Sequence, residues 1–248
     1  VIELVGPKRF RGICSDNTGN TTKARNQVHE KYPWIQILPD ACHRLGRLCG
    51  DICKMDCFKD VISNLRRTLK FFSKSTDARE HLRRKRAELG IRRGLVSIGK
   101  TRFASIYHAA ASLIRCMPAL RELCTSGTIN ITFSADLENL VKVLEPIGKS
   151  IECLESTHST VSDVYLFWLA CMASIHDIIV HDDSLETSVK EDIRQATNRR
   201  WIQMIEQAPC DVYYTGFFFD PRECRHQTEG IQPLISCQNI ADTIYGRI

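Results

Sequence analysis

The sequence predicts an α+β protein that is predominantly α-helical: a partial α/β sheet followed by a large all-α block. Two patterns predict this class. Residues 10–38 show a strand, a helix and a second strand, which is the length of one parallel crossover. Residues 41–207 then carry helical periodicity. Hydrophobic residues make up 43% and charged residues 25% of 248 residues, which excludes a disordered or collagen-like chain.

The opening strand is expected over residues 10–14. It runs into a polar turn over residues 15–20, rich in Asp, Asn and Gly, which favour turns. A helix over residues 21–32 follows, with Asn20 or Thr21 as its expected N-cap.

Pro33 ends this helix, and residues 34–38 alternate in polarity as a second strand does. Two strands do not form a stable sheet alone. Either the helices cover this sheet, or further strands lie in sequence beyond this chain. The predicted organisation is therefore a partial α/β core over residues 1–45 and a helical domain over residues 46–248.

Seven helices are expected in the second part, over residues 41–55, 58–74, 76–89, 101–124, 134–156, 161–180 and 185–207. The second of them shows the clearest one-sided apolar stripe, formed by Phe58, Val61, Ile62, Leu65, Leu69 and Phe72. Pro118 is expected near a helix end. Residues 212–221 form an aromatic run closed by Asp-Pro, for which no element type is predicted.

No apolar run reaches the roughly 18 residues that a membrane span needs. The longest, residues 165–175, is interpreted as a buried helix. The 12 cysteines are scattered rather than packed into a small loop-rich domain. We therefore expect free thiols in a reducing compartment, the nucleus or the cytoplasm, and no membrane partner.

Positive charge is concentrated in one tract. Residues 61–102 hold 13 Lys or Arg and 3 Asp or Glu, an excess of 13 − 3 = +10, whereas the whole chain has a net charge of +5. This asymmetry indicates a surface for a polyanion. The alternative is a solvated helix face laced with ion pairs.

Asp16 lies where a parallel strand ends and a helix begins, which is where ligands gather in open α/β sheets. Its carboxylate could bind Mg²⁺ or form a local turn. His43 follows the second strand, so the two residues are expected near each other. Two-metal phosphoryl transfer needs further carboxylates.

Two other motifs occur in the sequence. A zinc site is conceivable from Cys42, His43, Cys49, Cys53 and Cys57, but their spacing favours a buried cysteine stripe. Residues 94–101 satisfy the letters of a Walker phosphate loop, G-x-x-x-x-G-K-[ST]. The segment before them is basic and helical, whereas that loop requires a preceding strand. Nucleotide binding is therefore a rival interpretation.

Several boxes occur in the order found in one family. They are RGICSDNTGN at residues 11–20, KYP at 31–33, CHRL at 42–45, KTRFAS at 100–105, LVKVLEPIGKSIECLE at 140–155, RW at 200–201 and FFFDPR at 217–222. In this order the chain resembles the hAT transposase superfamily, and more closely the domain of unknown function in plant and fungal hAT-like proteins. The resemblance spans nearly the whole chain.

The resemblance implies an RNase H-like core with a helical insertion, and Mg²⁺-dependent DNA strand transfer by three carboxylates. Asp16 matches the second carboxylate and would be a metal ligand, and His43 matches the family histidine. The first carboxylate is expected before Val1 and the third after Ile248. We therefore expect no phosphoryl transfer by this chain alone.

DNA binding with weak sequence preference is the main functional expectation. The expected phosphate contacts are Arg83, Arg84, Lys85, Arg86, Arg92, Arg93, Lys100 and Arg102. Two hypotheses follow: a transposase-derived, DNA-binding fragment with an incomplete strand-transfer site, or a non-catalytic helical module for protein interaction or homo-oligomerisation.

Overall fold

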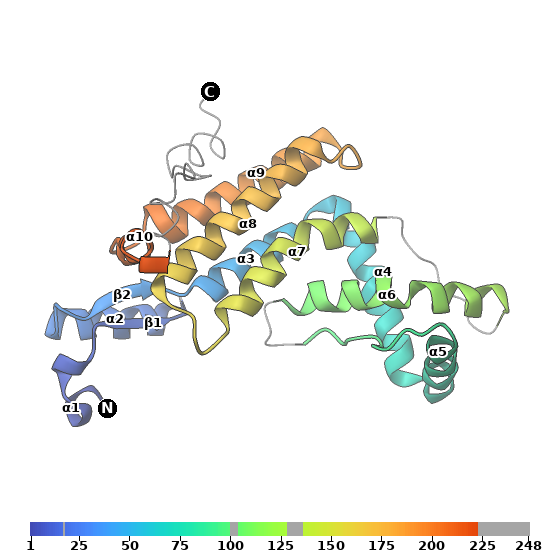
Figure 1. Ribbon diagram of the computed structural model, residues 1–248, viewed down its shortest axis with the longest axis horizontal. Helices are drawn as coiled ribbons and strands as arrows, with labels where there is room; N and C mark the ends of the chain where they lie inside the picture. The colour runs from blue at the N-terminus through green and yellow to red at the C-terminus, as the bar shows by residue number, and fades with distance from the viewer. Residues whose placement is uncertain (17, 100–103, 128–135, 223–248) are drawn as a thin grey trace.

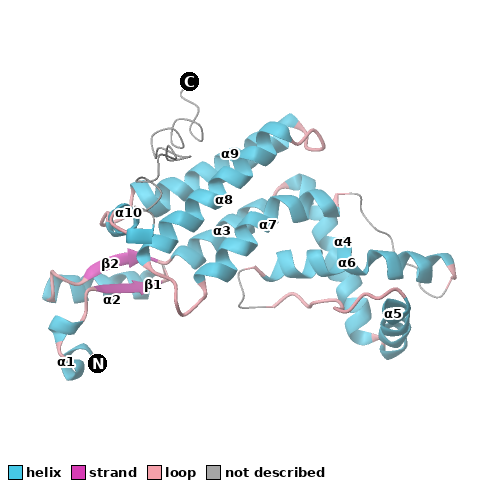
Figure 2. Ribbon diagram, in the orientation of Figure 1, coloured by secondary structure: helices cyan, strands magenta, loops and turns pink. Residues whose placement is uncertain are grey.

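The computed structural model describes residues 1–16, 18–99, 104–127 and 136–222. Of these residues, 73% are helical and 4% lie in strands, so the predicted predominantly α-helical α+β class is confirmed. Figure 2 shows an elongated helical molecule with two short strands near one end.

The first part of the chain forms a small α/β unit. Its elements are α1 (Ile2–Val5), a 3₁₀ turn (Pro7–Arg9), β1 (Gly12–Ser15), α2 (Gly19–Lys31) and β2 (Gln36–Pro39). The strands pair in parallel with Ile13 beside Ile37, as the crossover length predicted. The prediction of the N-cap was wrong: α2 begins at Gly19 with Thr18 as N-cap, because Thr21 instead donates to the Asp16 carbonyl.

Each of the seven predicted helices has a counterpart in the described residues, and the predicted helical residues 101–103 and 134–135 lie outside them. They are α3 (Ala41–Ile52), α4 (Asp56–Lys74), α5 (Thr76–Glu88), α6 (Ser105–Thr125), α7 (Leu137–Leu154), α8 (Val161–His181) and α9 (Thr187–Trp201). A π-helical turn (Ile202–Glu206) follows, and the aromatic run forms α10 (Val212–Phe218). Pro118 lies inside α6 rather than near its end. It is exposed, and proline there removes one helical hydrogen bond.

One hydrophobic core runs through the helical part, from Ala41 in α3 to Tyr213 in α10. Helix α7 packs against α3, α6 and α8, and α8 packs against α9 and α10. Helices α4 and α5 pack with α6 at the other end of the molecule (Figure 1). Trp168 on α8 is fully buried in this core.

The α/β unit has little core of its own and contacts the segment that contains the start of α10. The Tyr213 hydroxyl donates to the carbonyl of Pro39 at 2.7 Å, and the Cys210 thiol donates to the carbonyl of Ile37 at 3.5 Å. Figure 1 shows α10 beside β2. Residues 210–213, which lie in the predicted helical domain, therefore contact β2, which lies in the predicted α/β core on the other side of the boundary near residue 45.

A buried arginine joins α9 to α3. Arg200 is 7% exposed, and its guanidinium donates to the Asp51 carboxylate at 2.8 Å and to the Gln203 side chain at 2.8 Å. Arg44 donates to the same Gln203 oxygen at 3.0 Å. Removing one partner of such a buried ion pair is costly, so Arg200 is a structural residue of the helical core.

Within the described residues, one helix, α8, is long and apolar enough to cross a membrane by length and composition. Its buried residues face α7, α9 and α10 and include Tyr165, Trp168, Met172 and Ile175. The core helix of a protein without membrane spans passes the same test of length and composition.

Candidate nucleic-acid interface

Asp16 lies at the carboxyl end of β1, against the start of α2. Its Oδ1 atom accepts a hydrogen bond from the Thr18 hydroxyl at 3.4 Å. A hydrogen bond from Thr21 is the largest cause that lowers the pKa of the Asp16 carboxyl, with smaller contributions from Thr18 and the nearby His43. An anion is also favoured at a helix N-terminus. Asp16 is therefore held in its charged form.

The turn that carries Asp16 is organised by a buried arginine. Arg25 on α2 is 4% exposed, and its Nη1 atom donates to the Ser15 carbonyl, to the Ser15 hydroxyl at 2.8 Å and to the Asp16 carbonyl at 2.8 Å. Sequence reasoning missed Arg25. The signal available in the sequence was a charged residue inside the predicted helix, close to the polar turn of residues 15–20.

His43 lies in the first turn of α3, directly after β2. Its backbone N–H donates to the carboxylate of the N-cap Asp40 at 2.9 Å. Because β1 and β2 are parallel neighbours, their carboxyl ends meet, and His43 contributes to the electrostatic environment of Asp16. The two residues share one edge of the small sheet.

This corner does not fit a two-metal centre. Across residues 1–16, 18–99, 104–127 and 136–222, no three His, Cys, Asp or Glu side chains come close enough to hold a metal ion. Two-ion phosphoryl transfer requires several carboxylates. The residues present do not fit the implied Mg²⁺ pair, and the cysteine-rich zinc alternative is not assembled there either.

The cysteine stripe is only partly buried. Cys49 is buried, Cys53 is half-buried and Cys57 is exposed. The ten cysteines among the described residues are free thiols.

The basic tract lies far along the molecule from the Asp16 corner. Figure 1 places the α/β unit at one end and α5 at the other. Helix α5 packs against α4 and α6. Asp16 and the predicted phosphate contacts on α5 therefore lie on separate surfaces.

Several of the predicted phosphate contacts have partners within the protein. Arg83 forms two hydrogen bonds with the Glu80 carboxylate, at 2.8 and 2.6 Å. Lys85 pairs with Glu88 at 2.7 Å and Glu122 at 3.2 Å. Arg84 is exposed and bonds the ring of His81 at 2.8 Å.

The other predicted contacts divide into three kinds. Arg86 donates to the carbonyls of Ile91 and Arg92, at 3.2 and 2.9 Å, and so holds the following segment in place. Arg92 and Arg93 are exposed. Lys100 and Arg102 lie outside the described residues.

A second cationic surface lies on α4, on residues that are not among the predicted phosphate contacts. Arg66, Lys70 and Lys74 are exposed and four residues apart, so they lie on one helix face, with Arg67 beside them. None of these four side chains forms an ion pair with a described residue. We call these four residues the α4 cationic face. The spacing of 66, 70 and 74 within the charged tract was the signal that could have found it.

An aromatic side chain lies within the α4 cationic face. Phe71 is 42% exposed and, together with Arg67, Lys70 and Lys74, lines a shallow depression of about 400 Å³. Its buried neighbour Phe72 holds it edge-to-face, with ring centroids 5.2 Å apart. Cations around an exposed ring are the combination that single-stranded nucleic-acid surfaces use for phosphates and bases.

The Walker-like segment does not have phosphate-loop geometry. It follows α5 and a turn rather than a strand, and α6 begins only at Ser105. Its described residues, 94–99, are extended along α6 and form one wall of a cavity.

Comparisons of the chain with protein-family models, with curated proteins and with solved structures find no match.

Proposed function

We propose that this chain is a DNA-binding, hAT-like transposase-derived fragment with an incomplete metal-dependent strand-transfer site. The observation that supports DNA binding most directly is the α4 cationic face. Its four cations lack carboxylate partners among the described residues, whereas Arg83 and Lys85 on α5 have them. Contacts between such cations and DNA phosphates position a protein on the duplex but carry little sequence preference.

The geometry of the face suits a phosphate backbone. Arg66 to Lys74 spans about 12 Å of helix at roughly 1.5 Å per residue. Duplex DNA carries one charge per about 1.7 Å of its axis when both strands are counted, so a duplex of that length has about seven phosphate charges. Like charges four residues apart on a helix repel by a few tenths of a kcal/mol per pair, and a bound polyanion relieves that repulsion.

Two observations support the strand-transfer part of the proposal. Asp16 and His43 share one edge of the small sheet, and they occur in the order in which the hAT-like boxes occur. An RNase H-like core would supply the remaining carboxylates from sequence beyond this chain. DNA binding would place the protein in the nucleus.

Salt-dependent binding of a mixed-sequence duplex tests the proposal. Fluorescence anisotropy between about 50 and 200 mM salt should give log affinity falling linearly with log salt, with a slope of about −0.9 per phosphate contacted. The triple variant R66Q/K70Q/K74Q removes three contacts, so its slope should be less steep by about 2.7.

The matched control is K8Q/R11Q/K23Q, which removes the same charge from exposed residues of the α/β unit. It should leave the slope unchanged. Absence of binding at low salt contradicts DNA binding. A slope altered only by the control triple would place the DNA at the α/β unit instead.

One observation favours the second candidate, a module for self-association. Tyr214, Phe218 and Phe219 at α10 are 45%, 58% and 72% exposed. Adjacent exposed aromatic side chains are typical of protein contacts. Light scattering of the whole chain tests this candidate: a dimer that F218S/F219S converts to a monomer, in a protein without DNA affinity, would favour it.

A further inference from the structure

A cavity of about 900 Å³ lies between the segment of residues 93–99, α6 and α7. This volume is in the range of small-molecule sites. Its lining includes Arg93, Ser97, Tyr107, His108, Arg115 and Lys149. None of these residues belongs to the α4 cationic face.

The segment that walls the cavity is held firmly against α6. The Ser112 hydroxyl accepts from the backbone N–H of Val96 at 2.8 Å and donates to the Ala109 carbonyl at 2.7 Å. The Ser105 hydroxyl donates to the Gly99 carbonyl at 3.1 Å. Arg86 holds the start of the segment through two carbonyls. The cavity wall is therefore a built structure, with an anchor at each end.

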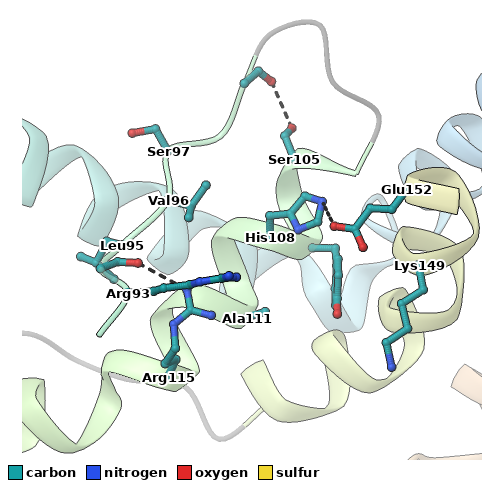
Figure 3. A pocket seen from close by; sticks show the side chains of 13 residues that line it. Arg93, Leu95, Val96, Ser97, Ser105, His108, Ala111, Arg115, Lys149 and Glu152 are labelled. Atoms are coloured by element: carbon teal, nitrogen blue, oxygen red, sulfur yellow. Dashed lines mark hydrogen bonds and ion pairs between the residues drawn. The ribbon is translucent and has the colours of Figure 1, made fainter. Parts of the chain in front are cut away.

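Two arginines face one side of the cavity. Arg93 comes from the segment and Arg115 from α6, and both line the cavity (Figure 3). Arg115 donates to the Gly94 carbonyl at 3.4 Å, and neither guanidinium forms an ion pair with a described carboxylate. Guanidinium groups that line one cavity can each donate paired hydrogen bonds to a phosphate group.

The part of the cavity lining nearer the start of α6 is aromatic. The Tyr107 and His108 rings lie 5.1 Å apart with an interplanar angle of 56°. Gly148 on α7 makes room for Tyr107, because a Cβ there would lie 2.3 Å from the Tyr107 Cδ1 atom. His108 pairs with Glu152 at 3.3 Å (Figure 3). This part offers a ring surface and polar groups. Lys149 also lines the cavity and pairs with Glu145 at 2.7 Å.

We infer that this cavity binds a nucleoside phosphate, with the phosphate on Arg93 and Arg115 and the base against Tyr107 and His108. The ligand can be a free nucleotide or the phosphorylated 5′ end of a DNA strand, because both present the same chemistry. The site does not use a Walker loop, although residues 94–99 of the Walker-like segment form one of its walls. The inference does not depend on DNA binding by α4.

Equilibrium binding to the whole chain tests the inference with two probes: ATP by calorimetry, and a short fluorescent single strand with either a 5′-phosphate or a 5′-hydroxyl by anisotropy. We expect saturable binding of ATP or of the 5′-phosphorylated strand in preference to its hydroxyl form. R93Q/R115Q should weaken that binding by tenfold or more. The control R121Q changes an exposed arginine on α6 outside the cavity and should leave binding unchanged.

Tighter ATP binding identifies a free nucleotide, and tighter binding of the phosphorylated strand identifies a strand end. The inference is overturned if neither probe saturates, or if R93Q/R115Q binds as tightly as the wild type. Circular dichroism checks that the variants are folded. The R66Q/K70Q/K74Q variant should keep its ATP affinity, so failure of the DNA-binding proposal and failure of this inference are distinguishable.

Discussion

The guanidinium of Arg86 lies directly against the backbone of Gly94, where a Cβ would come within 2.5 Å of its Nη1 atom. From this position Arg86 donates to the carbonyls of Ile91 and Arg92. A residue expected to contact phosphate instead positions the segment that carries Arg93. The absence of a side chain at Gly94 is what permits this contact.

Replacing Arg86 should therefore loosen the cavity wall. We expect R86M to lower the free energy of unfolding by about 1–3 kcal/mol, because two carbonyls lose a charged donor. ATP affinity should fall with it. Urea unfolding and calorimetry measure the two effects, and R84M, on the exposed side of the same helix, is the control. Equal stability of R86M and R84M would contradict this role.

Arg25 should be essential to the turn that carries Asp16. We expect R25M to destabilise the α/β unit by about 2–3 kcal/mol, because two carbonyls and a hydroxyl lose their buried cationic donor. Hydrogen exchange of the amides of residues 12–16 reports this locally. K23M changes an exposed residue of the same helix and should leave those rates as they are.

Neutralising Asp16 should leave DNA affinity intact. We expect D16N to bind a mixed-sequence duplex with the wild-type salt slope, because the α4 cationic face lies at the other end of the molecule. Anisotropy titration measures this. With millimolar Mg²⁺, neither protein should nick supercoiled plasmid. Plasmid nicking by the wild type that D16N abolishes would contradict the incomplete site.

Asp182 should make stability depend on pH in the acid range. Hydrogen bonds from Ser184 and Lys142 lower the pKa of its carboxyl to about 2, against about 3.9 in an unfolded chain. The stabilisation is therefore full above about pH 4 and is lost as the pH falls through 2.

The D182N variant tests this pH dependence. We expect it to be less stable than the wild type at pH 7, by a few tenths to about 1 kcal/mol. The difference should vanish near pH 2. A difference between the two proteins that stays constant across urea midpoints from pH 7 to pH 2 would refute the assignment.

Thiol reactivity should separate buried from exposed cysteines. Burial raises the pKa of Cys171 to about 12, whereas Cys153 is exposed. Because the thiolate is the reactive form, alkylation at pH 8 should modify Cys153 rapidly and Cys171 only when the core opens. Peptide mapping by mass spectrometry follows both sites, and both should react at once in urea. Equal rates in the native protein would contradict the buried position of α8.

Much of the fold could be predicted because the patterns are local. The stripe from Phe58 to Phe72 predicted α4, since its spacing of three and four residues exists only on a helix. The crossover length predicted the parallel pairing of β1 and β2. The N-cap of α2 was missed because Thr21 bonds the Asp16 carbonyl, a contact that sequence spacing does not specify.

For the candidate nucleic-acid interface, the sequence predicted the positive charge but not which cations are available to a ligand. The sequence by itself determined that a tract near residues 61–102 is strongly cationic and that α4 has a polar outer face, because both depend on residue order alone. Only the tertiary structure decided which cations are available. Glu122 reaches Lys85 from a helix far along the chain, and Gly94 admits Arg86. Ion pairing and cavity formation depend on contacts between distant segments, and packing of the whole chain sets those contacts.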